Sequence, residues 1–352
     1  MGYKKRSFGT TKDNKEAYIY TFENKNGLKA EISDLGAIIV SVFVPGKDGR
    51  LRDVVLGYDS VSEYEGESLF FGAAVGRNAN RISGPEFKIN DRVYKLKETG
   101  KGINLHSGPD HYRTRVWDTK EVSDNYIKLS LFSPDGDQGF PGNADICVTY
   151  ELTDENEIRI SYEAVSDADT IFNLTNHNYF NLNGCRPQLC GKDMSIEGHE
   201  AVIYADAFTV TDERSIPTGE IRPVKGTPMD FTKPKTIGRD INEDYDQLKM
   251  AEGYDHNWAV NGEGFRKAAA LRSEESGIGL EVYTDLPGVQ FYTGNYIDGR
   301  RGKGGLIYPA RSGVCFETQF FPDAVNHENF KSPVVRAGEA YKTATIYKFI
   351  NF

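Results

Sequence analysis

The sequence is poor in cysteine. Only four cysteines occur in 352 residues, too few for a disulfide framework in a chain of this length. Cys185 and Cys190 are five positions apart, which differs from the spacing of a CxxC redox or zinc motif. Cys147 and Cys315 lie in strand-like runs and are expected to be buried as small apolar residues. We therefore expect free thiols in a reducing compartment.

Long apolar runs are also missing. The most apolar run covers residues 37–44, whereas a transmembrane helix needs about 20 apolar residues. The first 18 residues hold no apolar stretch of the kind found in a signal peptide. These absences predict a soluble, cytoplasmic protein with no membrane partner.

The chain has no excess of basic residues. It carries 42 Lys and Arg against 52 Asp and Glu, a net charge of −10. Proteins that bind nucleic acid need clustered positive charge against the phosphates, so no nucleic-acid partner is expected. The one notable basic cluster, Arg300, Arg301 and Lys303, lies in a glycine-rich loop and is typical of a solvated surface.

The common catalytic motifs are absent. The sequence contains no HExxH, no Walker loop, no GxSxG and no GxGxxG after a strand. A metalloprotease, an NTPase, an α/β-hydrolase and a nicotinamide enzyme are therefore disfavoured.

Strand signals dominate what is present. Residues 157–164, EIRISYEA, alternate between apolar and polar side chains, as a half-buried strand does. Asp48-Gly49 between two apolar runs predicts a hairpin turn. The segments VSEYEGE and INEDYDQLKMAEG predict short helices at most. Because no repeat or linker interrupts the strands, we expect one all-β domain over residues 1–352, a large antiparallel β-sandwich with few short helices.

One acid is placed unusually. Glu317 lies in CFETQFFPDAVN between apolar residues of a predicted strand. Burying a charge costs several kcal/mol unless a partner compensates. Glu317 is therefore either an outward, solvated residue or a carboxylate whose burial has a use.

Three histidines lie in polar and aromatic surroundings where strands give way to loops. These are His106 in GINLHSG, His177 in NLTNHNYFNL and His256 in YDHNW. A structural role is the more frequent reading for any one of them, but together they indicate a binding site. The asparagines around His177 are unusual for a strand. They could orient His177, hold a hydroxyl-rich ligand, or cap turns.

GRNANRISG adds Arg77 and Arg81, with Asn78 and Asn80 between them. If the segment bends, Asn80 and Arg81 can approach one ligand, and this pair of residue types suits recognition of hydroxyls. A surface salt bridge is the alternative. Aromatic residues near these motifs could stack on sugar rings or belong to the core: Tyr179, Phe180, Trp258, Phe291, Tyr292, Phe320 and Phe321.

Seven motifs, in order along the chain, closely resemble those of the galactose mutarotase (aldose 1-epimerase) family. They are GRNANRI, NLHSG, SPDGDQGFPGN, NLTNHNYFNL, YDHNW, PGVQFYTGN and CFETQFFPDAVN. The resemblance runs from about residue 31 to the end of the sequence. It implies a β-sandwich of the galactose mutarotase type, no cofactor, no metal, and interconversion of the α and β anomers of free aldohexoses such as galactose and glucose.

The resemblance also implies roles for particular residues. Glu317 corresponds to the catalytic base and His177 to the catalytic acid, with His106 assisting. The residues that correspond to sugar-binding positions are Asn80, Arg81, Asp255 and Gln290. His256 corresponds to no catalytic position, which returns it to a structural role.

The sequence departs from the family pattern in two places. Ser107-Gly108 follows the first histidine, where the family often has Gly-Gly, and the Phe320-Phe321 pair stands at a variable position. Either departure could tune which sugar fits.

The residue types suit the reaction. Opening a cyclic hemiacetal needs a base at the C1 hydroxyl and an acid at the ring oxygen, each with a pKa near the working pH. An apolar wall of Phe316, Phe320 and Phe321 would raise the pKa of Glu317 and make it a better base.

Three other functions stay open on the sequence. A sugar-phosphate epimerase, such as a hexose-6-phosphate 1-epimerase, would need basic groups such as Arg300, Arg301 and Arg311 at the site. A glycoside hydrolase would need two carboxylates, which Glu317 and Asp255 could supply. A non-catalytic sugar-binding protein needs no acid and base. The sequence predicts a small sugar as partner and no particular oligomeric state.

Overall fold

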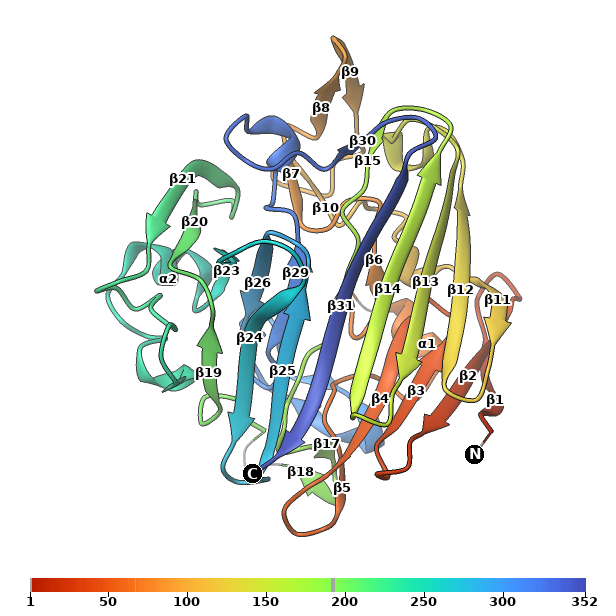
Figure 1. The fold of residues 1–352 in the computed structure, drawn as a ribbon, viewed down its shortest axis with the longest axis vertical. Coiled ribbons are helices and arrows are strands. Elements are labelled where there is room, and N and C mark those ends of the chain that lie inside the picture. The colour runs from red at the N-terminus through yellow and green to blue at the C-terminus, as the bar shows by residue number, and fades with distance from the viewer. Residues whose placement is uncertain (1, 67, 191–193) are drawn as a thin grey trace.

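The computed structural model describes residues 2–66, 68–190 and 194–352, and antiparallel strands dominate these residues (Figure 1). A five-stranded sheet comes first, in the order β1-β2-β3-β4-β5. Its strands are β1 (Lys4–Thr10), β2 (Glu16–Glu23), β3 (Lys29–Ser33), β4 (Ile38–Pro45) and β5 (Leu51–Asp53).

The largest sheet has nine strands in the order β11-β12-β13-β14-β31-β25-β24-β19-β22. Its central strand, β31, pairs with β14 on one side and with β25 on the other, and Figure 1 shows these long strands side by side. The nine strands are β11 (Asp118–Val122), β12 (Tyr126–Ser133), β13 (Ala144–Leu152), β14 (Glu157–Ser166), β19 (Glu200–Ile203), β22 (Lys235–Thr236), β24 (Arg266–Ser273), β25 (Ile278–Thr284) and β31 (Ala340–Asn351).

A third sheet, of five strands, supports the site. Its order is β21-β20-β23-β26-β29. The strands are β20 (Ala207–Thr211), β21 (Pro217–Pro223), β23 (Asp255–Ala259), β26 (Gly288–Tyr292) and β29 (Cys315–Gln319). One face of this sheet packs on the nine-stranded sheet, where the Tyr347 hydroxyl of β31 donates to the Phe316 carbonyl at 3.1 Å.

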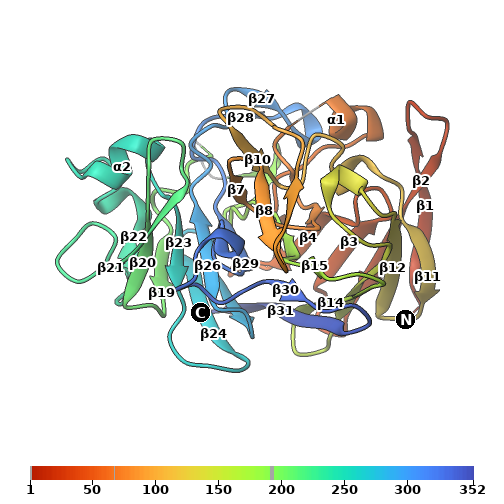
Figure 2. The ribbon, with the colours of Figure 1, turned by 90° about the horizontal axis from the view of Figure 1, so that it is seen from above.

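Short strands form further antiparallel pairs, among which β10 with β7 and β16 with β6 precede the loops that carry His106 and His177. Figure 2 shows β24 and β31 on one side of the molecule, β26 and β29 next, and β7 and β10 beyond them. The short strands are β6 (Ala74–Val75), β7 (Arg81–Ser83), β8 (Glu86–Ile89), β9 (Arg92–Lys95), β10 (Ile103–Leu105), β15 (Thr170–Ile171), β16 (Thr175–Asn176), β17 (Cys185–Arg186), β18 (Leu189–Cys190), β27 (Arg300–Arg301), β28 (Ile307–Tyr308) and β30 (Val334–Val335).

A single hydrophobic cluster joins the three large sheets. It includes Phe22 of β2, Ile160 of β14, Phe291 of β26 and Phe316 of β29, all at most 2% exposed. Sheets that bury their apolar faces against one another form a sandwich. The prediction of an antiparallel β-sandwich is therefore confirmed.

Local predictions are confirmed as well. In β14 the side chains of Ile158, Ile160 and Tyr162 are buried while Arg159 and Ser161 are exposed. The hairpin predicted at Asp48-Gly49 joins β4 and β5, and Gly49 takes the positive φ of 74° that such a turn requires.

The helices are short, as predicted. Within the described residues the α-helices are α1 (Val61–Gly66) and α2 (Asp246–Ala251). Neither of these is long and apolar enough to cross a membrane.

Candidate active site

Glu317 lies at the middle of β29 on the face turned away from the nine-stranded sheet. It is 2% exposed, and its neighbour across the sheet is Gln290 of β26. Its Oε2 is buried without a hydrogen-bond partner among the described residues. Burial, with a smaller contribution from the charge of Asp255, raises the pKa of Glu317 well above its usual value, and Arg81 opposes the rise.

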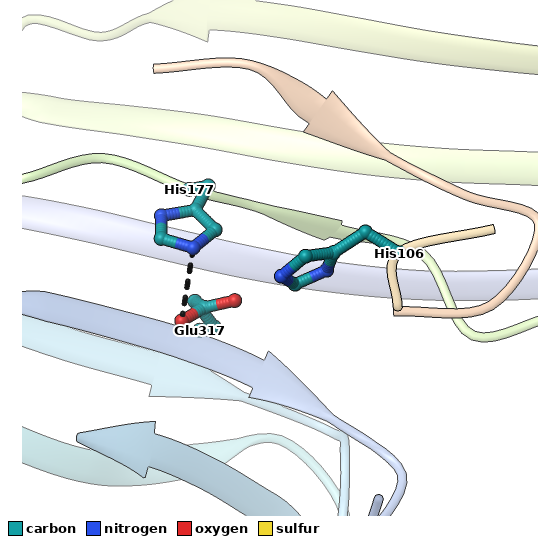
Figure 3. Close-up of side chains that lie close together, drawn as sticks. All are labelled: His106, His177 and Glu317. Atoms are coloured by element: carbon teal, nitrogen blue, oxygen red, sulfur yellow. Dashed lines mark ion pairs between the residues drawn. The ribbon is translucent and has the colours of Figure 1, made fainter. Parts of the chain in front are cut away.

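His177 faces Glu317 from the loop after β16. Its Nε2 lies 3.5 Å from Glu317 Oε1, the contact drawn in Figure 3. The imidazole stacks on Tyr179, with ring centroids 4.9 Å apart, and on Phe70 at 5.8 Å. Burial lowers the pKa of His177 to about 4, although the Asp255 carboxylate acts in the opposite direction. The ring is therefore fixed in orientation and neutral at neutral pH.

His106 points at the same space from the loop after β10 (Figure 3). Its ring Nδ1 accepts a hydrogen bond from the Asn80 backbone N–H at 3.1 Å, and the His106 backbone N–H donates to the Asn80 carbonyl at 2.8 Å. Burial lowers the pKa of His106 well below its usual value. A neutral ring that accepts at Nδ1 carries its hydrogen on Nε2, so His106 presents an N–H donor to the site.

These three side chains are also of the types that bind metal ions. One ligand atom from each of His106, His177 and Glu317 lies within 4.8 Å of the others, and two histidines with a carboxylate are a familiar ligand set. A metal-bound histidine usually donates its second ring hydrogen to an acceptor. Here the Nδ1 of His106 is occupied by an N–H donor, which leaves its Nε2 protonated. That arrangement suits hydrogen bonding to a ligand better than coordination.

Arg81 and Asp255 form the charged wall of the site. An Arg81 guanidinium nitrogen lies 3.5 Å from Asp255 Oδ2. The Gln290 amide donates to Asp255 Oδ1 at 2.7 Å, and Arg81 also donates to the Asn80 side-chain oxygen at 3.2 Å. Asn80 has a positive φ of 62°, which gives the expected bend, and Asn80 and Arg81 line the same cavity.

A cavity of about 150 Å³ lies between these groups. Six of the seven predicted site residues line it, and Gln290 does not, because its amide lies behind Asp255. The lining residues are Ser68, Leu69, Phe70, Asn80, Arg81, Leu105, His106, His177, Tyr179, Asp255, Tyr292, Tyr296 and Glu317.

Some lining residues were not expected from the sequence. Phe70 contacts the rings of His106 and His111 at 4.7 Å each, and no pattern in its own segment marked it. Tyr296 is 45% exposed at the cavity and was also missed, although it follows the PGVQFYTGN motif directly. Tyr292, from that motif, lines the cavity. This is the position expected if it stacks on a sugar ring, one of the two roles considered for the aromatic residues.

The side chains around Glu317 differ from the apolar wall of Phe316, Phe320 and Phe321 that the sequence predicted. Phe316 points to the opposite face of β29 and packs on Phe291, with ring centroids 5.3 Å apart. Phe320 and Phe321 do not line the cavity. Burial of Glu317 comes instead from Tyr179, Tyr292 and the residues of the covering loops, because strand alternation sends Phe316 away from Glu317.

Other motif residues have structural roles. Arg77 is 1% exposed, and it donates to the carbonyls of Ser133, Pro141 and Gly142 rather than forming a surface salt bridge. His256 is fully buried outside the cavity and accepts the Asp255 backbone N–H at 3.2 Å.

Some of the amides around His177 bind neighbouring backbone, whereas both polar side-chain atoms of Asn178 are buried without a hydrogen-bond partner among the described residues. Asn176 donates to the Gly72 carbonyl, and Asn181 to the carbonyls of Met194 and Ser312. These bonds hold the segment that carries His177, which favours the orienting role over direct binding of a ligand. Ser107 is likewise occupied with the Asn78 backbone.

Comparison with known proteins identifies the family of this chain. The family model described as aldose 1-epimerase matches residues 18–348. The chain is 40% identical to galactose mutarotase from Homo sapiens over 92% of its length and 91% of the relative. It is 36% identical to aldose 1-epimerase from Escherichia coli K12, over 94% of its length and 95% of the relative.

Solved structures that superpose on this chain indicate the same family. Galactose 1-epimerase from Lactobacillus acidophilus superposes with a TM-score of 0.86 at 29% identity, covering 100% of this chain and 99% of that one. An aldose epimerase homologue from C. elegans gives 0.87 at 29% identity, covering 95% and 99%. The chain therefore belongs to the aldose 1-epimerase family.

Proposed function

We propose that the protein interconverts the α and β anomers of free aldohexoses such as galactose and glucose, with Glu317 as the base and His177 as the acid. The observation that carries the proposal is the 3.5 Å contact between Glu317 Oε1 and His177 Nε2. Both groups line one small cavity beside Arg81 and Asp255.

One catalytic proton, shared between Glu317 and His177, is enough for the reaction. In the complex with the closed sugar, the shared proton lies on His177 Nε2 and Glu317 is ionised. Glu317 then takes the proton of the C1 hydroxyl while His177 Nε2 gives the shared proton to the ring oxygen O5, and the C1–O5 bond breaks to leave an aldehyde. Rotation about C1–C2 turns the other face of the carbonyl toward O5. Reclosure returns both protons by the reverse transfers, so the enzyme ends unchanged. Each positioned transfer contributes about 10²- to 10⁴-fold in rate.

Burial strengthens both groups in these roles. A carboxylate whose pKa is raised is a stronger base, and an imidazolium whose pKa is lowered is a stronger acid. In the ring-opened state the proton rests on Glu317 and His177 is neutral, which is the charge distribution that burial favours. The energy of the intermediate is thereby lowered relative to the closed sugar.

The remaining residues would hold the sugar. His106 offers Nε2–H to a hydroxyl, while Arg81 and Asp255 offer charged hydrogen bonds, which are stronger than neutral ones. Asn80 and Gln290 would act mainly by fixing Arg81 and Asp255, to which they are hydrogen-bonded. Tyr296 offers an exposed ring to the apolar C–H face of a sugar.

The alternatives find less support. Arg300, Arg301 and Arg311, the candidates for a phosphate site, do not line this cavity, which disfavours a hexose phosphate. In Asp255 one carboxylate oxygen accepts from Gln290 and the other pairs with Arg81, so this acid is not free to serve a glycosidase.

Three broader expectations belong to the proposal. The hydrophobic cluster shared by all three large sheets supports a single domain over residues 1–352. The net charge of −10 supports a protein without a nucleic-acid partner. A cytoplasmic location stays a prediction, which cell fractionation tests.

Proton NMR of freshly dissolved α-D-galactose tests the proposal directly, because the two anomers give separate C1–H signals. Faster equilibration with the protein than with buffer is the expected result. A galactose-binding protein that leaves the anomers at the solvent rate would contradict the proposal. Turnover of a hexose 6-phosphate faster than galactose, or release of nitrophenol from a nitrophenyl galactoside, would favour the corresponding alternative.

A further inference from the structure

Cys315 lies where it can control the ring of His177. It is the first residue of β29, two positions before Glu317, so both side chains leave the same face of the strand. The Cys315 Sγ lies 3.6 Å from His177 Nδ1, while Glu317 Oε1 lies 3.5 Å from Nε2. One strand thus presents a thiol to one nitrogen of the imidazole and a carboxyl group to the other.

We propose that Cys315 is a positioning residue whose sulfur accepts a hydrogen bond from His177 Nδ1–H, which leaves Nε2 as the nitrogen that exchanges the catalytic proton. The inference rests on the proposed function. It assigns His177 and His106 opposite neutral tautomers, because His106 accepts at Nδ1 and carries its hydrogen on Nε2.

The state of the thiol fits this role. Burial, with added contributions from the charges of Glu317 and Asp255, raises the pKa of Cys315 well above its usual value. The group is therefore a neutral thiol at neutral pH, and its sulfur is a weak acceptor. Burial raises the pKa of Glu317 and so favours its protonated form, and that proton needs a bare Nε2 as acceptor.

A weak, neutral acceptor suits this acid better than a carboxylate would. In hydrolases that use a histidine as base, a carboxylate at Nδ1 stabilises the imidazolium. A thiol fixes which nitrogen is exposed without adding a charge, so the pKa of His177 stays near 4. The backbone of His177 also favours the protonated ring by hydrogen bonding, and the variants below separate the two contributions.

The direct test is a long-range ¹H–¹⁵N correlation spectrum of the full-length protein labelled with ¹⁵N in histidine. The spectrum tells which ring nitrogen carries the hydrogen, and His177→Asn and His106→Asn assign the signals. We expect His177 to be protonated at Nδ1 and His106 at Nε2. A wild-type spectrum with the His177 hydrogen on Nε2 would overturn the proposal whatever the kinetics.

Two variants of Cys315 test the catalytic consequence. Cys315→Ser keeps an acceptor, so both the tautomer and kcat should stay close to wild type. Cys315→Ala removes it, so the His177 signals should shift toward a mixture and kcat should fall about 10- to 100-fold, as for other residues that orient a functional histidine, with KM unchanged. Cys147→Ala, on β13 outside the cavity, is the matched control.

The outcomes separate this inference from the proposed function. An alanine variant with wild-type kcat and an unchanged tautomer would show that the backbone alone suffices, and would refute the role of Cys315. If Cys315→Ala fails to fold, the wild-type spectrum and the serine variant still decide. A wild-type protein that accelerates no sugar would refute the proposed function and leave the tautomer assignment to the spectrum.

Discussion

Replacing Glu317 by glutamine should make the protein inactive and, at alkaline pH, more stable. The substitution keeps the shape of the side chain and removes its ability to take a proton. Loss of a general base lowers kcat by about 10²- to 10⁴-fold. Because glutamine keeps a hydrogen-bonding side chain of the same shape at this position, we expect a much smaller change in KM.

The stability gain follows from the burial of Glu317. The residue is 2% exposed and its Oε2 has no partner among the described residues. A buried polar group without a partner costs about 1–3 kcal/mol, and a charged one more. A carboxyl group with a raised pKa binds more protons folded than unfolded, so it lowers stability progressively as pH rises above its ordinary value of 4.5. Glu317→Gln should therefore gain about 1–3 kcal/mol at pH 8 and almost nothing near pH 4.

Urea unfolding of both proteins at the two pH values measures this difference, and the NMR anomer assay measures the rate. Glu213→Gln, at an exposed position, controls for the loss of one negative charge and should change neither quantity. A Glu317→Gln protein that keeps more than a tenth of the wild-type kcat would refute the base assignment. A glutamine variant with the same stability as wild type at both pH values would refute the reasoning from burial.

Three further outcomes are expected. His177→Asn should lower kcat by about 10²- to 10⁴-fold while calorimetry still detects galactose binding; a retained rate would assign the acid elsewhere. Asp255→Asn should raise KM roughly 10- to 150-fold, since a hydrogen bond to a charged group contributes about 1.5–3 kcal/mol. It should also shift the acid limb of the kcat/KM profile to lower pH, because the Asp255 charge helps raise the pKa of Glu317; an unmoved limb would contradict that coupling. Prolonged dialysis against EDTA should leave the rate unchanged, because His106 directs an N–H at the cavity; activity lost to EDTA and restored by Zn²⁺ would refute the tautomer.

The pattern of the strands and the position of the acid could be predicted from the sequence. The alternation of apolar and polar residues predicted strand β14, and the position of an acid between apolar residues marked Glu317, because both signals are local. The environment of Glu317 could not be predicted in this way. Phe316 and Phe320 are close to it in sequence, yet several of its neighbours in space, such as His177 and Tyr179, come from a segment more than 100 positions away.

The roles of small and polar residues were harder still. Cys315 was expected to be buried as a small apolar residue, and it is buried, but the sequence does not show which group its sulfur contacts. The assignment of Gln290 to sugar binding stays a prediction, because the resemblance assigns a residue but not the direction of its amide. In the structure that amide donates to Asp255.

The place of β31 in the nine-stranded sheet has a consequence for how the protein is made. Among the strands described, only β31 joins the two halves of this sheet. One half is β11 to β14, and the other is β25, β24, β19 and β22. Both halves can emerge from the ribosome and collapse separately, but each exposes an unpaired edge until β31 arrives. Such edges are open to pairing with other chains, so the newly made protein should be most dependent on chaperones just before β31 is released from the ribosome.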